Sequence, residues 1–246
     1  MSETTLAFII AVFVLAGFVK GVIGLGLPTV SMGLLALVIP PVEAAAVLVL
    51  PSLLTNIWQM LSGPFLMAAI KRLWPMMIAV CAGTWAAAGL MTGAYESFMT
   101  ALLGLILVLY AVSGFTALRL GVPKAHEWWL GPAMGGITGV ITAATGVFVI
   151  PAVPYLQAIG LEKDELIQAL GLSFTVSTVA LAANVARAGA INMGMAGTTA
   201  GALVAAIVGM WLGQMLRVRL KPEAFRRWFF AGLFLLGVYL MVGALL

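Results

Sequence analysis

The chain has 246 residues, of which 63% are hydrophobic and 8% are charged, and its mean hydropathy is +1.18. Because the apolar residues run along the whole length, the composition indicates a multi-pass protein in a lipid bilayer. The polar stretches are too short to fold alone, which excludes an appended catalytic domain. The net charge of +4 comes from basic residues at the ends of apolar segments, so we expect no nucleic acid partner.

Hydrophobic segments are expected at about 5–19, 29–39, 43–62, 73–93, 98–119, 128–140, 147–160, 165–187, 195–216 and 224–246. Two short segments precede three long ones, and this order then repeats. As helices the short segments cover roughly 16–24 Å, which is less than the roughly 30 Å of hydrocarbon core. We therefore expect half-helices there, and eight to ten hydrophobic segments in all.

Glycines interrupt the short pair at a similar place in each half. Residues 17–29 read GFVKGVIGLGLPT and residues 135–146 read GGITGVITAATG. Each glycine weakens a helix by roughly 1 kcal/mol relative to alanine, so these clusters predict breaks. Broken backbone at membrane depth is tolerated where it lines a cavity or is buried in protein, and paired breaks in two halves are typical of a transport site.

Each short pair is either one kinked span or a re-entrant hairpin, and the basic residues distinguish these arrangements. With eight plain spans, Lys163, Arg217, Arg219, Lys221, Arg226 and Arg227 lie outside the cell although Lys71 and Arg72 lie inside. With two hairpins only Arg187 lies outside, and the inner side holds Lys71, Arg72, Arg119, Lys124, Lys163, Arg217, Arg219, Lys221, Arg226 and Arg227. The positive-inside rule favours the hairpins.

Three full spans in each half turn the second half upside down relative to the first. We therefore expect an all-α polytopic membrane protein with two inverted repeats, each a broken-helix re-entrant hairpin followed by three transmembrane helices. The repeats cover residues 1–120 and 121–246, and together they form one transport domain. Glu43 and Ser52 align without gaps to Asp164 and Ser173, which supports this register.

A stripe of polar residues marks the long helix after each hairpin. In the first half Ser52, Thr55, Asn56 and Gln59 share one helix face, at spacings of i, i+3, i+4 and i+7. In the second half Ser173, Ser177 and Asn184 have similar spacing, with Thr175 and Thr178 beside them. Such residues either form hydrogen bonds between helices or line a substrate pathway, and both interpretations stay open.

Lys20 is the most informative single residue, because it lies inside an apolar segment beside the first predicted break. No aspartate or glutamate is expected at its depth, so its partner is an anionic substrate, unless the side chain snorkels to the membrane interface or bonds backbone carbonyls at the broken helix. Pro28 at a helix start, with free N–H groups between Gly24 and Thr29, adds partial positive charge. The candidate substrate-binding residues at the two tips are thus Lys20, Gly21, Gly24, Gly26, Pro28, Thr29, Thr142, Thr145 and Gly146.

An enzyme and a channel are the other classes of function that a membrane protein of this composition could have. An intramembrane enzyme needs a nucleophile with a base, paired aspartates or a metal cluster, whereas this chain has one cysteine, Cys81, and one histidine, His126. We therefore expect no enzyme activity, no metal site and no cofactor. An anion channel remains an alternative, and a homodimer is left open.

The chain resembles the sulfite exporter TauE/SafE family of membrane permeases. The resemblance rests on residues 17–26, on Glu43-Ala44 at the entry to the next helix, and on residues 168–174, which read QALGLSF. It implies a secondary transporter in the cytoplasmic membrane that moves a small anion such as sulfite, a sulfonate or a sulfoacetate-like oxyanion. A carrier of a small carboxylate is the other reading.

Overall fold

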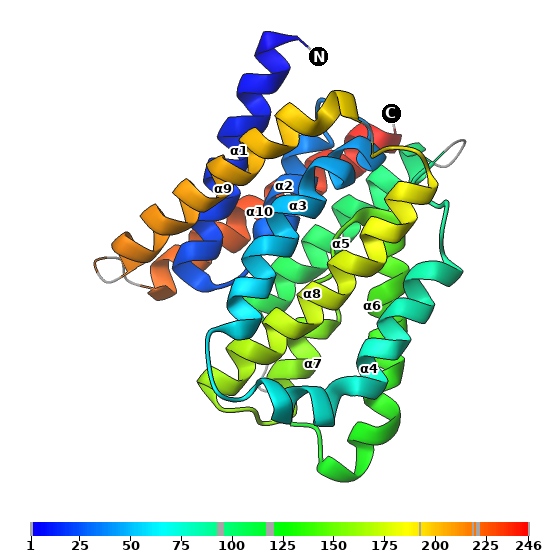
Figure 1. The fold of residues 1–246 in the computed structure, drawn as a ribbon, viewed down its shortest axis with the longest axis vertical. Helices are drawn as coiled ribbons and strands as arrows, with labels where there is room; N and C mark the ends of the chain where they lie inside the picture. The colour runs from blue at the N-terminus through cyan, green and yellow to red at the C-terminus, as the bar shows by residue number, and fades with distance from the viewer. Residues whose placement is uncertain are drawn as a thin grey trace.

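The computed structural model describes residues 2–92, 96–116, 121–191, 193–217, 219 and 222–245, and Figure 1 shows them as a bundle of helices. The described residues contain no strand, which confirms the all-α class. The main helices are α1 (Glu3–Ile23), α2 (Leu27–Leu35), α3 (Pro41–Leu61), α4 (Leu66–Ala86), α5 (Glu96–Thr116), α6 (Glu127–Thr145), α7 (Ala152–Ala158), α8 (Lys163–Arg187), α9 (Ala196–Arg217) and α10 (Pro222–Leu245). Arg119, Lys221 and the expected repeat boundary at residue 120 lie outside the described residues.

Within the described residues seven helices are long and apolar enough to cross a membrane, namely α1, α3, α4, α5, α8, α9 and α10. The prediction of a half-helix at 5–19 is wrong, because α1 has 21 residues and continues through Gly17 and Gly21. At 1.5 Å per residue its length is roughly 32 Å, which is enough to span the hydrocarbon core. The other member of each pair is short, with 9 residues in α2 and 7 in α7.

The helix breaks lie at the ends of the two glycine-rich stretches. Gly24 and Gly26 adopt left-handed backbone conformations with φ of 77° and 107°, and Gly146 does so with φ of 71°. These angles are unfavourable for residues with a side chain, which explains the need for glycine at these positions. We call residues 24–26 the first tip and residues 146–151, which connect α6 to α7, the second tip.

The earlier glycines of each stretch bring helix backbones together instead of breaking the helix. A Cβ atom at Gly17 or Gly21 would collide with the carbonyl groups of Ala206 and Met210 on α9. In the other half, a Cβ atom at Gly135 or Gly139 would collide with the carbonyl groups of Met76 and Val80 on α4. Close packing of this kind overrides the low helix propensity of glycine.

Four helix pairs make the most extensive contacts: α1 with α9, α4 with α6, α5 with α10, and α3 with α8. Helices α3 and α8 carry most of the buried polar side chains, while large apolar side chains on other helices are exposed, among them Leu15, Ile78, Val204 and Leu235. The outer surface is thus suited to lipid and the polar groups lie inside. Both chain ends lie toward the top in Figure 1, and the α3–α4 connection lies toward the bottom.

Candidate functional site

Lys20 lies inside the helix bundle, with 5% of its surface exposed. Helix α1 brings it against α3, where its Nζ donates a hydrogen bond of 3.0 Å to Thr55 Oγ1 and a second to Asn56 Oδ1. Thr55 can accept because its own hydroxyl donates to the Pro51 carbonyl at 2.8 Å. Neither alternative for this lysine, snorkelling to the membrane interface or bonds to backbone carbonyls at the helix break, is seen in this conformation.

The hydrogen bonds continue from α3 to α8. Asn56 Nδ2 donates to Ser52 Oγ at 3.0 Å and to Thr178 Oγ1 at 3.3 Å, and the Ser52 and Thr178 hydroxyls lie 3.2 Å apart. We call the five residues Lys20, Ser52, Thr55, Asn56 and Thr178 the Lys20 cluster. It joins three helices, and all five side chains are buried. The sequence placed Thr178 only beside the polar stripe, because its contact depends on how α8 crosses α3.

The Lys20 cluster contains a basic group and no acidic one. The hydrogen bonds of Lys20 go to neutral oxygens, and the ion pair formed among the described residues is that of Arg72 with Glu127. A buried lysine without an acidic partner is costly, and it favours an anion that supplies the missing negative charge.

The first tip connects α1 to α2 close to this lysine. The Gly24 N–H donates to the Lys20 carbonyl at 2.8 Å, so the expectation that it is free is wrong. Helix α2 begins at Leu27 with Pro28 in its first turn, and Thr29 Oγ1 donates to the Gly26 carbonyl at 2.9 Å. The first N–H groups of α2 therefore remain as the positive end of a short helix. Gly21 instead packs against α9.

The threonines at the end of α6, just before the second tip, are less available to ligands than expected. Thr142 Oγ1 donates to the Thr138 carbonyl at 2.7 Å, and Thr145 Oγ1 donates to the Ile141 carbonyl at 2.8 Å. Gly146 closes α6 by donating its N–H to the Thr142 carbonyl at 2.9 Å. No hydrogen bond links these three residues to the Lys20 cluster within the described part of the chain.

Three of the candidate substrate-binding residues on α3 and α8 make no hydrogen bond to the Lys20 cluster within the described residues. Gln59 Nε2 donates to the Ile167 carbonyl at 3.2 Å, which favours the interpretation as a bond between helices. The hydroxyls of Ser173 and Ser177 are fully buried and have no hydrogen-bond partner among the described residues.

Gln168 is a structural residue that the polar pattern did not single out. Its side chain donates to the carbonyl groups of Met60 and Gly63, both at 2.8 Å, and accepts from the Phe65 N–H at 2.5 Å. These bonds tie α8 to the α3–α4 connection.

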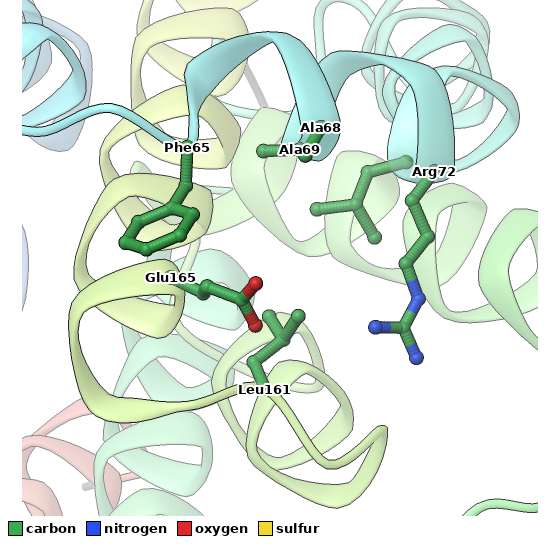
Figure 2. A pocket seen from close by; sticks show the side chains of 7 residues that line it. Phe65, Ala68, Ala69, Arg72, Leu161 and Glu165 are labelled. Atoms are coloured by element: carbon green, nitrogen blue, oxygen red, sulfur yellow. The ribbon is translucent and has the colours of Figure 1, made fainter.

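A pocket at the α3–α4 end of the molecule lies away from the Lys20 cluster. Figure 2 shows its lining side chains, from the start of α4 on one side and from Leu161 and Glu165 on the other. Arg72 at its edge makes two bonds to Glu127, Nε to Oε2 at 2.8 Å and Nη2 to Oε1 at 2.7 Å, and a third to the Ile159 carbonyl at 2.8 Å. The hydrogen bond and charge of Arg72 lower the pKa of the Glu127 carboxyl.

A broken helix beside a buried polar cluster, within an apolar bundle, is typical of one class of protein, the multi-pass membrane transporters. No group of acidic, histidine or cysteine side chains in the described part of the chain is suited to hold a metal ion.

The chain belongs to the sulfite exporter TauE/SafE family, whose model matches residues 9–240. This match covers nearly the whole chain and confirms the resemblance seen in the sequence. No curated protein and no solved structure matches the chain.

Proposed function

We propose that this chain is a secondary transporter that moves a small oxyanion, such as sulfite, a sulfonate or a sulfoacetate-like molecule, across the cytoplasmic membrane. The observation that carries the proposal is Lys20, a buried basic side chain whose partners, Thr55 and Asn56, are both neutral. An oxyanion offers several acceptor atoms to one ammonium group, and a charge-assisted contact of this kind is stronger than a neutral hydrogen bond.

The pairing of helices supports two inverted repeats as the frame of this site. In this comparison α1 corresponds to α6, α3 to α8, α4 to α9 and α5 to α10. If each helix is exchanged for its counterpart, the α1–α9 pair becomes the α6–α4 pair. The same exchange leaves the α3–α8 and α5–α10 pairs unchanged. We therefore propose that residues 1–120 and 121–246 form two repeats around α3 and α8, and that together they make one transport domain.

Helix directions support the inversion of the second repeat. Contacts of Gly17 with Ala206 and of Gly21 with Met210 run in parallel, as do those of Gly135 with Met76 and Gly139 with Val80. Helices α3 and α8 run antiparallel instead, since Ser52 meets Thr178 while Met60 meets Gln168. Two repeats that run in opposite directions through the membrane are typical of transporters whose central site opens alternately to the two sides.

Flux into proteoliposomes tests the proposal. Purified protein is reconstituted, and uptake of sulfite, two sulfonates and two short carboxylates is compared while pH and sodium gradients are varied separately. Saturable uptake of sulfite or a sulfonate supports the proposal. Preference for the carboxylates identifies a carboxylate carrier, and unitary currents identify a channel. Either of these results contradicts it.

A further inference from the structure

Ser173 and Ser177 are unusual among the buried serine and threonine residues of this bundle. Their neighbours on α8 satisfy their hydroxyls within the helix, since Thr175 donates to the Gly171 carbonyl at 2.7 Å and Thr178 donates to the Phe174 carbonyl at 2.6 Å. Ser173 and Ser177 have 0% exposure and make no hydrogen bond within the described residues. A buried polar group without a partner is costly, so two of them on one helix face point to a ligand.

Contacts of α8 show where the two hydroxyls face. The ring of Phe174 packs on Phe148 in the second tip, with 5.3 Å between the ring centroids. Asn184 donates to the Thr84 carbonyl of α4 at 2.7 Å. With about 100° per residue, Ser177 and Ser173 lie about 60° and 100° from Phe174, on the side where Asn184 lies at about 80°. Ser177 therefore faces the sector between the second tip and α4, and Ser173 faces the α4 side of α8, about 20° beyond Asn184.

The second tip, which packs on α8 through Phe148, carries backbone oxygen atoms that no backbone donor reaches. Residues 146–151 are not helical, and the side chains of Val147, Phe148 and Val149 have 0% exposure, so the chain is unwound inside the protein. In the described residues the backbone N–H groups of Gly146 and Val153 donate to Thr142 and Val149, and no backbone donor reaches the carbonyls from Ala143 to Val147. These carbonyls also form the negative end of α6.

The chemistry of these groups favours a cation. Carbonyl and hydroxyl oxygens are the ligands that hard cations prefer, and unwound backbone with a half-helix C-terminus is a known way to hold sodium at membrane depth. An oxyanion would meet the negative ends of the carbonyl dipoles. We propose that Ser173 and Ser177, together with carbonyl oxygens of residues 143–147, bind a sodium ion.

The first repeat differs at the corresponding positions, which assigns the ion to the second repeat. Ser52, the counterpart of Ser173, is already bonded to Asn56 and Thr178, and the basic Lys20 lies beside them. A cation is repelled there and an anion is attracted. As a consequence that rests on the proposed transport function, the anion occupies the first repeat and sodium the second, so that sodium drives or accompanies anion movement.

Sodium binding is tested on the full-length protein in detergent, without any substrate anion. Melting temperature is measured against NaCl concentration with choline chloride holding the ionic strength constant, and with KCl in parallel; binding of radioactive sodium is measured on the same samples. We expect a rise in melting temperature with sodium only. Ser173→Ala and Ser177→Ala each weaken sodium binding by about tenfold or more, since each removes a ligand to a charged group. Thr175→Val, a matched change on the same helix, leaves sodium affinity unchanged, and Ser177→Thr keeps it because the hydroxyl remains.

Several results overturn the sodium site. They are a wild-type protein that sodium stabilises no more than choline does, alanine variants with wild-type sodium affinity, and alanine variants that melt lower than wild type in choline alone. The last result would mean that the hydroxyls serve the fold. Because no anion is present, this test is separate from the transport proposal. A protein that binds sodium at these serines but moves no oxyanion contradicts only the proposed function.

Discussion

Lys20 determines the chemistry of the candidate site because its side chain is the basic member of a cluster of neutral groups. Thr55 and Asn56 hold the Nζ atom with two hydrogen bonds, and Asn56 is held in turn by Ser52 and Thr178. The lysine is therefore positioned before any ligand arrives, which reduces the entropy lost on binding.

Replacing Lys20 tests its role as the anion ligand. A charge-assisted contact contributes roughly 1.5–3 kcal/mol, so Lys20→Met raises the dissociation constant for the anion by roughly tenfold to a hundredfold. Lys20→Arg keeps the charge in a different geometry and retains part of the affinity. Calorimetry on the purified variants measures both. Equal affinities for wild type and Lys20→Met would remove this lysine from substrate recognition.

The residues of the site differ in how far the sequence predicts them. Lys20, Ser52, Thr55 and Asn56 follow from helical spacing and from the cost of a charge at membrane depth, and the structure brings them together. Gln59 has the same spacing but reaches the Ile167 carbonyl at a different level. The contacts of Thr178 and Gln168 depend on where α8 crosses α3. The periodicity of a single helix carries no information about that crossing. The orphaned hydroxyls of Ser173 and Ser177 likewise emerge only from the three-dimensional packing.

At the scale of elements, two adjacent glycines of α6 distinguish packing from helix propensity. A Cβ atom at Gly135 collides with the Met76 carbonyl of α4, whereas one at Gly136 meets nothing within 4 Å. Gly135→Ala is therefore expected to destabilise the protein by about 1–3 kcal/mol through overpacking. Gly136→Ala is neutral or stabilising by up to about 1 kcal/mol. Melting temperatures in detergent measure the difference, and equal destabilisation by both changes would refute the close approach of α6 and α4.

The ion pair of Arg72 and Glu127 joins the start of α4 to the start of α6. Arg72 belongs to one of the seven candidate spans, whereas Glu127 lies outside them. The folded state lowers the pKa of Glu127 from its ordinary 4.5, so its contribution to stability is present above that value and is lost as pH falls through the folded-state pKa. Glu127→Gln is expected to lower the melting temperature at pH 7, with a difference from wild type that shrinks below about pH 4.5. A difference that stays constant as pH falls would show that the pair does not stabilise the fold through charge.

Element lengths were harder to predict than the positions of the breaks. The helices end at glycines of the two glycine-rich stretches, Gly24 in the first and Gly146 in the second, because the left-handed backbone at these positions favours glycine. The expected half-helix at 5–19 is instead a full-length α1, since Gly17 and Gly21 are used for contact with α9. A glycine that breaks a helix and a glycine that lets two helices touch look the same in one sequence.

At the scale of the whole molecule, the paired helices and the basic residues lead to one topology. We expect the N- and C-termini to lie on the same side of the membrane, outside the cytoplasm, opposite Lys71, Arg72 and the basic cluster from Arg217 to Arg227. Reporter fusions at each terminus and in the α3–α4 connection, residues 62–65, measure this. A cytoplasmic N-terminus together with a cytoplasmic α3–α4 connection would contradict the first hairpin and the inverted repeat.

Counterflow in proteoliposomes is the most direct test of a carrier that binds its anion at Lys20, because counterflow requires both a binding site and a return step. Vesicles are loaded with unlabelled sulfite, and uptake of labelled sulfite is compared for wild type and Lys20→Met. We predict saturable uptake that internal sulfite accelerates in wild type, with a rate at subsaturating sulfite about tenfold or more lower in Lys20→Met. Absence of accelerated exchange in wild type, or equal exchange in the two proteins, would contradict a carrier that recognises its anion through Lys20.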